Sequence, residues 1–211
     1  MPIEAVVFDM DGVLIDAKDW HYEALNRALE YFGYSISRAD HLTTYDGLPT
    51  RRKLDLLSQE RGLPRGLHGF LSDLKQQYTV DLVHLRCKPM FVHEYALSNL
   101  KARGYRLGLG SNSIRSSVEL MMQKSNLIGY LDVMVSNEDV KKAKPHPDIY
   151  LKAAADLGVA PENCLVVEDN QNGIMAAEAA GCPLLVVNNV LEVQLDRILQ
   201  AIRHAEEGQR G

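Results

Sequence analysis

Short runs of apolar residues recur along the chain, and they have the length of strands rather than of helices. A run without polar positions has no side for solvent, which is typical of a strand that is covered on both faces of a parallel sheet. The predicted strands span residues 5–8, 107–109, 133–135, 165–167 and 184–187.

Segments with helical spacing fill most of the intervals between these strands. They span residues 91–103, 114–126, 148–157 and 173–180, and a glycine follows three of them directly. The triplet Ser111-Asn112-Ser113 offers N-cap side chains to the helix at 114–126. This alternation predicts an α/β fold, a doubly wound parallel sheet with helices on both faces.

The alternation fails in one interval. Between residues 17 and 82 the sequence predicts only helices, at residues 19–32, 50–61 and 67–84. We therefore predict an α/β core domain of residues 1–16 and 83–211, and a helical cap domain of residues 17–82 inserted into it. Asp16, at the junction, either orients the preceding loop or caps the first cap helix.

Composition and charge narrow the class of protein. The chain has 211 residues, of which 46% are hydrophobic and 24% charged, as in soluble globular proteins. Its net charge is −5, whereas nucleic acids and anionic membranes select basic surfaces, so we expect neither as a partner. No apolar run suits a signal peptide or a membrane span, and we expect a cytoplasmic protein. The sequence does not fix the oligomeric state, and it is compatible with a monomer.

Acidic residues follow two predicted strands at the point where each strand ends. Asp9 and Asp11 come after the first strand, and Glu168 and Asp169 come after the fourth. The carboxyl ends of parallel strands share one edge, where open α/β sheets bind ligands, so these side chains should meet in one crevice. Four carboxylates would repel one another without a cation, and oxygen ligands favour Mg²⁺. The sequence therefore predicts a magnesium site.

A hydroxyl and a lysine complete this set. Ser111 follows the second strand, and Lys144 stands directly before a Pro-His-Pro segment whose rigid backbone can aim it into the crevice. A transferring phosphoryl group needs a cation, a lysine and hydrogen-bond donors around its oxygens. A carboxylate can then be the nucleophile, so Asp9 is the candidate nucleophile and Asp11 the candidate acid and base.

Four short motifs appear in order along the chain: Asp9-Met10-Asp11-Gly12, Ser111, Lys144-Pro145 and Glu168-Asp169. In these motifs, and over essentially its whole length, the sequence resembles the haloacid dehalogenase superfamily of phosphatases and phosphomutases. Residues 144–150 and 168–174 are similar to the β-phosphoglucomutase-like subfamily, in which a helical cap follows the first motif. Asn170 departs from the family pattern, in which serine often follows the Glu-Asp pair.

The resemblance implies a role for each motif residue. Asp9 would be the phosphorylated nucleophile, and Asp11 would be the acid and base. The groups that hold the phosphoryl oxygens would be Ser111 and Lys144. The magnesium ligands would be Asp9, Asp11 through its backbone carbonyl, Glu168 and Asp169.

Substrate choice is expected from the cap. Three cations, Arg51, Arg52 and Lys53, occupy the first turn of the helix at 50–61, where they oppose the helix dipole, and contact with an anionic substrate would explain them. Of the three, Arg51 is the candidate for substrate binding. The resemblance implies that His21 and Lys75 also contact substrate, since their counterparts in β-phosphoglucomutases help the sugar to reorient. Asn112, at the end of the second strand, is a further candidate for substrate binding.

Three activities fit these residues. The favoured one is a Mg²⁺-dependent phosphatase that acts on a small phosphorylated metabolite, such as a sugar phosphate, through an aspartyl phosphate. A phosphohexomutase of the β-phosphoglucomutase type uses the same intermediate. A receiver module of a signalling protein also combines a phosphorylated aspartate with a hydroxyl and a lysine, but the inserted helices and the second acid, Asp11, argue against it.

Overall fold

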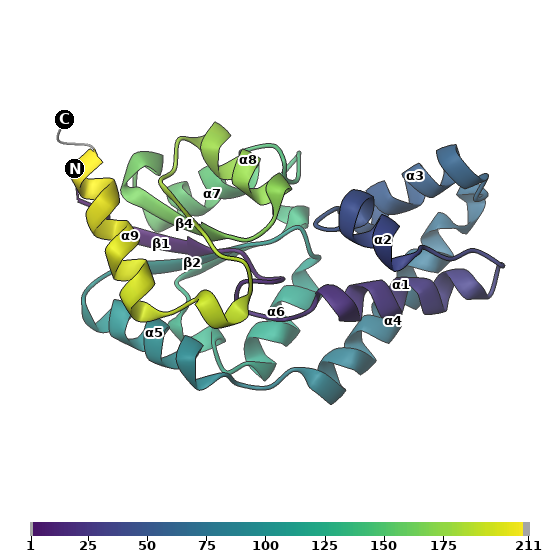
Figure 1. Ribbon diagram of the computed structural model, residues 1–211, viewed down its shortest axis with the longest axis horizontal. Helices are drawn as coiled ribbons and strands as arrows, with labels where there is room; N and C mark the ends of the chain where they lie inside the picture. Colours follow the sequence, from purple (N-terminus) through teal and green to yellow (C-terminus); the bar gives the residue numbers. More distant parts are fainter. Residues whose placement is uncertain (1, 209–211) are drawn as a thin grey trace.

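Five parallel strands form one sheet in the order β3-β2-β1-β4-β5 (Figure 1). The computed structural model describes residues 2–208. Each predicted strand forms, with ends shifted by at most one residue, and the predicted α/β fold is confirmed. The strands are β1 (Ala5–Phe8), β2 (Arg106–Gly110), β3 (Val133–Val135), β4 (Cys164–Glu168) and β5 (Leu184–Val186).

Alternate side chains of β1 enter two separate hydrophobic cores, one on each face of the sheet. Val6 and Phe8 pack in the core that α5, α6 and α9 cover, and Ala5 and Val7 pack in the core that α7 and α8 cover. This period of two requires apolar residues at every position of the strand. The covering helices are α5 (Phe91–Ala102), α6 (Arg115–Lys124), α7 (Asp148–Leu157), α8 (Gln171–Ala180) and α9 (Leu195–Gly208).

The predicted N-cap of α6 is wrong, and so is one of the two alternatives for Asp16, the cap of α1 (Lys18–Glu30). Ile114 is the N-cap residue of α6 and provides no side-chain cap, because the hydroxyl of Ser113 turns away from the helix and donates to Asp11. Ala17 is the N-cap residue of α1, again without a side-chain cap, and Asp16 is exposed. Ser113 therefore contacts the loop at the sheet edge rather than capping the helix that follows it.

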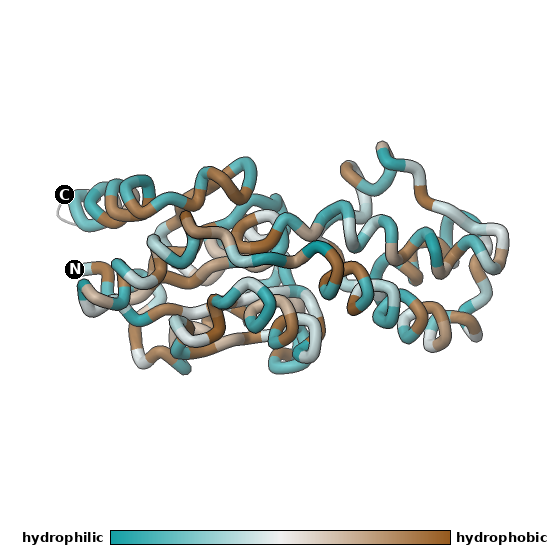
Figure 2. Tube along the Cα trace, turned by 90° about the horizontal axis from the view of Figure 1, so that it is seen from below, coloured by the Kyte–Doolittle hydropathy of each residue, from teal (hydrophilic) through white to brown (hydrophobic). Residues whose placement is uncertain are grey.

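A second group of helices lies beyond one end of the sheet (Figures 1 and 2). It has its own core, which includes Leu25, Leu29, Leu54 and Leu57. The predicted helical insertion is thus present, although α4 continues past residue 82 to Arg86, so the predicted domain boundary falls inside a helix. The elements are α1, α2 (Arg38–Asp40), a π-helical turn (His41–Tyr45), α3 (Thr50–Arg61) and α4 (His68–Arg86).

The register of the sheet brings the candidate acids together. Phe8 pairs with Leu109 of β2 and with Val167 of β4, so the next residues, Asp9 and Glu168, lie side by side where β1 and β4 end. This edge faces the cap, and the start of β1 and the end of α9 lie at the opposite end of the molecule (Figure 1).

Two smaller observations concern the described residues. Within them, every helix is too short or too polar to cross a membrane. The cysteines Cys87, Cys164 and Cys182 are free and buried.

Candidate active site

Three carboxylates gather at the carboxyl edge of the sheet. Oxygen atoms of Asp9, Glu168 and Asp169 all lie within 4.8 Å of one another. Burial and the charge of Glu168 raise the pKa of Asp9 well above its usual value. Burial also raises the pKa of Asp169 to about 6, although Lys18 opposes the shift. Oδ2 of Asp169 is paired with Nζ of Lys18 at 2.6 Å, whereas Oδ1 has no partner among the described residues. Three carboxylate groups that offer oxygen atoms within this distance fit a hard divalent cation such as Mg²⁺.

Two glycines leave room for this cluster. A Cβ atom on Gly12, whose φ is 95°, would lie 2.0 Å from Oδ2 of Asp169. A Cβ atom on Gly173 would lie 1.6 Å from Oε1 of Glu168. Both positions therefore require glycine for steric reasons that involve the acidic residues directly.

Lys144 neutralises two of the acids. Its Nζ donates to Oδ1 of Asp9 and to Oε1 of Glu168, each at 2.6 Å, and the side chain is buried. Tyr150 of α7 donates a further hydrogen bond, of 2.7 Å, to the same oxygen of Glu168. Burial alone would lower the pKa of Lys144, but Asp9 and Glu168 outweigh it and the pKa is raised. Lys144 is thus a fixed cation beside the candidate nucleophile.

Asp11 has a different environment from Asp9. Ser113 Oγ donates to its Oδ2 at 3.1 Å, and Nε2 of His21 lies 3.1 Å from the same oxygen. Burial alone would raise the pKa of Asp11, but His21 and the Ser113 hydrogen bond outweigh it, so the pKa lies below its usual value. The two carboxylates of the first motif are therefore shifted in opposite directions.

A chain of contacts joins Asp11 to the cap. Nζ of Lys75, on α4, lies 3.3 Å from Nδ1 of His21, on α1. Burial lowers the pKa of His21 and lowers that of Lys75 to about 8. A charged lysine is a donor only, so Nδ1 of the neutral imidazole accepts and Nε2 carries the proton toward Asp11.

Ser111 and Asn112 line the same pocket but have different partners. Ser111 is buried, and its Oγ accepts a hydrogen bond of 3.0 Å from the backbone N–H of Ser113. The Asn112 amide bonds to both backbone groups of Lys144, with its Oδ1 accepting at 3.0 Å and its Nδ2 donating at 3.2 Å. Asn112 Nδ2 also donates to the carbonyl of Gly47 in the cap at 2.9 Å. Asn112 therefore positions Lys144 and ties the cap to the core.

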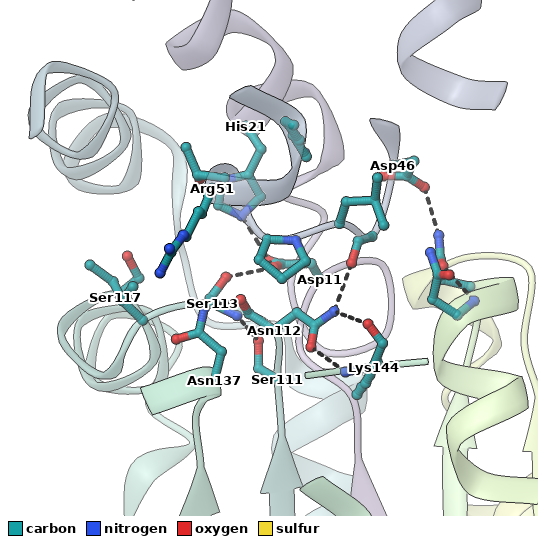
Figure 3. A pocket seen from close by; sticks show the side chains of 18 of the residues that line it. Asp11, His21, Asp46, Arg51, Ser111, Asn112, Ser113, Ser117, Asn137 and Lys144 are labelled. Atoms are coloured by element: carbon teal, nitrogen blue, oxygen red, sulfur yellow. Dashed lines mark hydrogen bonds and ion pairs between the residues drawn. The ribbon is translucent and has the colours of Figure 1, made fainter. Parts of the chain in front are cut away.

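The pocket lies between the core and the cap and has a volume of about 350 Å³. Figure 3 shows His21, Asp46 and Arg51 on the cap side, across from Asp11 and Lys144 on the core side. Arg51 is exposed and lines the pocket, as does the buried Lys53. All of the predicted site residues except Asp169 line this one pocket, and Asp169 adjoins it through Lys18.

The cap loop is docked on the core. Asn170 Nδ2 donates to Oδ2 of Asp46 at 3.0 Å. Lys18 Nζ forms an ion pair of 2.6 Å with Asp169 and lies 3.8 Å from Asp46. A Cβ atom on Gly47 would come within 2.5 Å of Asn170 Oδ1. The departure from the family pattern at Asn170 thus supplies a contact between the cap and the core.

Three residues of this site, Lys18, Asp46 and Tyr150, have no role in the sequence-based predictions, and Lys53 appears there only as one of three cations that could contact an anionic substrate. For Lys53 a signal exists, since it shares a helix face with the apolar Leu54 and Leu57. The other three meet their partners only through the tertiary fold, because the contacts join separate elements.

Comparison with known proteins agrees with this geometry. The family model for haloacid dehalogenase-like hydrolases matches residues 6–187. A phosphorylated carbohydrates phosphatase from Thermotoga maritima is 32% identical over 179 residues, which cover 85% of this chain and 82% of that protein. A phosphoglycolate phosphatase from Escherichia coli K12 is 30% identical over 201 residues, which cover 86% and 79%.

Among solved structures, β-phosphoglucomutase from Clostridium difficile aligns with a TM-score of 0.83 at 24% identity, over 96% of this chain and 98% of that one. This likeness supports the fold. The family model and the two phosphatases show that the similarity is also present in the amino-acid sequence. The family predicted from the four motifs is confirmed: the chain belongs to the haloacid dehalogenase-like hydrolases and is an enzyme of that family.

Proposed function

We propose that this enzyme is a Mg²⁺-dependent phosphatase of small phosphorylated metabolites that works through a phosphorylated Asp9. The observation that carries the proposal is the pair of unlike carboxylates two residues apart. Asp9 contacts Lys144 inside the acidic cluster, whereas Asp11 lies outside the cluster beside His21. One carboxylate is thus placed for attack and the other for proton transfer.

In the first half-reaction, a carboxylate oxygen of Asp9 attacks phosphorus and the bond from phosphorus to the ester oxygen breaks. Asp11 gives its proton to the departing oxygen. The negative charge of the bound phosphate raises the pKa of Asp11, which allows it to carry that proton. Lys144 and Ser111 hold the phosphoryl oxygens, because both line the pocket beside Asp9.

In the second half-reaction, water attacks the phosphorus of the acyl phosphate. Asp11, now ionised, takes the proton from this water, and the products are inorganic phosphate and free Asp9. Mg²⁺ would be held by Asp9, Glu168 and Asp169 with the backbone carbonyl of Asp11, and would offset charge on the phosphoryl group.

The substrate class follows from the pocket and from the relatives. A cavity of about 350 Å³ suits a small metabolite. The two related phosphatases are named for phosphorylated carbohydrates and for phosphoglycolate. A sugar phosphate remains our first candidate. We also propose that the cap of residues 17–82 closes over this site and keeps bulk water from it.

A phosphohexomutase is the second candidate, and the contact between His21 and Lys75 is the observation that favours it. In a mutase the phosphoryl group of Asp9 passes to a second hydroxyl of the sugar instead of to water. A receiver module does not explain the position of Asp11, because it has no leaving group to which Asp11 would donate a proton.

The test is a screen of phosphorylated metabolites for released phosphate, with Mg²⁺ and with a chelator, beside the near-isosteric Asp9→Asn variant. We expect Mg²⁺-dependent release by the wild type and none by the variant. Isomerisation of a hexose 1-phosphate that requires a bisphosphate, without net release, would establish the mutase. Failure to turn over any phosphate ester, including p-nitrophenyl phosphate, would contradict both enzymes.

A further inference from the structure

Lys53 is a buried cation without a protein partner. It lies in the first turn of α3, its exposure is 6%, and it lines the pocket between cap and core. Among the described residues, none forms a hydrogen bond or an ion pair with its ammonium group. A buried charge without a partner is costly, so proteins usually pair such groups or offer them to a ligand.

The acids near Lys53 are engaged elsewhere. Asp46 and Asp11 attract the lysine through space. Asp46 accepts a hydrogen bond from Asn170 and lies close to Lys18, and Asp11 contacts His21. Neither acid contacts Lys53 directly.

A second lysine increases the positive charge of this wall. Lys53 and Lys75 both line the pocket, and the charge of Lys53 helps burial to lower the pKa of Lys75. Arg51, on the same helix turn as Lys53, also lines the pocket (Figure 3). The cap therefore presents an excess of cations to whatever fills the pocket.

We propose that Lys53 binds a second anionic group of the substrate, on the leaving-group side of the transferred phosphate. The proposal rests on the proposed function, because Asp11 protonates the leaving oxygen and Lys53 lies within electrostatic reach of Asp11. The preferred substrates then carry a second anionic group, a carboxylate or another phosphate, as phosphorylated sugar acids and sugar bisphosphates do, and sugar phosphates with a single charged group are poorer substrates. An anion at Lys53 provides the partner that the protein does not.

The experiment compares pairs of substrates that differ in the second charge. We would measure kcat/KM for 6-phosphogluconate against glucose 6-phosphate, for phosphoglycolate against ethyl phosphate, and for fructose 1,6-bisphosphate against fructose 6-phosphate. The first two pairs test a carboxylate and the third tests a phosphate. We expect the wild type to prefer the charged member of at least one pair.

Lys53→Met keeps an unbranched apolar side chain about as long as the aliphatic part of lysine and removes the charged ammonium group. For the preferred pair we expect the ratio of charged to neutral kcat/KM to fall about 10- to 100-fold, through a higher KM, as for a lost hydrogen bond between charged groups. Lys53→Arg should keep most of the preference. Arg52→Met, a neighbouring cation that is exposed and does not line the pocket, should leave the ratio unchanged.

A second readout does not depend on activity. Without substrate, Lys53→Met should unfold at a higher temperature than the wild type, because the variant has no unpaired buried charge. A lower unfolding temperature would overturn the proposal, as would equal losses of activity on charged and neutral substrates. If the wild type itself hydrolyses none of these phosphate esters, that result would instead contradict the proposed function.

Discussion

Lys144→Met is the substitution whose effect the structure predicts most directly. The ammonium group lies 2.6 Å from Oδ1 of Asp9 and 2.6 Å from Oε1 of Glu168, and only 4% of the residue is exposed. The substitution leaves two buried carboxylates without their cation. Breaking a buried ion pair on one side costs about 3–5 kcal/mol, which is a large part of the about 5–15 kcal/mol that stabilises a typical domain.

This loss of stability should depend on pH. The pKa of Asp9 is already raised by burial and by Glu168, and without Lys144 it rises further. Between the unfolded pKa of Asp9 and this higher folded value, the folded state binds more protons than the unfolded state, so stability falls as pH rises. The difference between wild type and variant should therefore be larger at pH 8 than at pH 5.

Urea unfolding followed by circular dichroism at both pH values, with and without Mg²⁺, measures these effects. Mg²⁺ should restore part of the stability of the variant, because it replaces some of the lost positive charge, but it should not restore turnover. Lys142→Met is the control, since Lys142 is exposed in the same loop and should change stability by less than about 0.5 kcal/mol. A loss below about 1 kcal/mol at pH 8 would refute the assigned role of Lys144.

Three further substitutions probe the surroundings of the site. The buried Lys75 has a pKa of about 8 and binds its proton less well in the folded state than in the unfolded state, so the free energy of unfolding of the wild type should rise between pH 8 and 10.5. Lys75→Met should abolish this rise, which urea unfolding at several pH values would measure. Gly12→Ala should destabilise the fold by about 1–3 kcal/mol and weaken Mg²⁺ binding in calorimetry, because its φ is 95° and its Cβ would meet Asp169; unchanged Mg²⁺ affinity would argue against the metal site. Asn170→Ala removes the hydrogen bond to Asp46 and should weaken the contact between cap and core by about 1.5–3 kcal/mol. The expected results are a higher KM and a larger radius of gyration in X-ray scattering, and unchanged values would show that this hydrogen bond does not hold the cap.

The sequence predicts the sheet well because its strands are buried on both faces. In β1 every residue from Ala5 to Phe8 enters a core, so the apolar run and the strand coincide. The carboxyl-edge rule then places Asp9 and Glu168 at the same edge of the sheet, and the strand order of the structure makes them neighbours. Helix α3 also forms at its predicted residues, 50–61.

The cap side of the pocket is where sequence reasoning is weakest. Residues 51–53 are all cationic, and the pattern favours Arg51 for substrate contact, but the rotation of about 100° per residue turns Lys53 inward and leaves Arg52 outside. The side chain of Lys18 reaches Asp169 across the junction between cap and core. Such contacts depend on how the cap and the core are placed relative to each other, and local sequence patterns do not encode this placement.

The central claim is that the phosphoryl group passes through Asp9, and trapping it is the most direct test. Asp11→Asn removes the base for hydrolysis while keeping the size of the side chain. After brief exposure to a turned-over substrate with Mg²⁺, peptide mass spectrometry of this variant should find one phosphoryl group, on Asp9, and the double variant Asp9→Asn with Asp11→Asn should carry none. A phosphoryl group on any other residue, or none on the single variant while the wild type turns over the same substrate, would contradict the account.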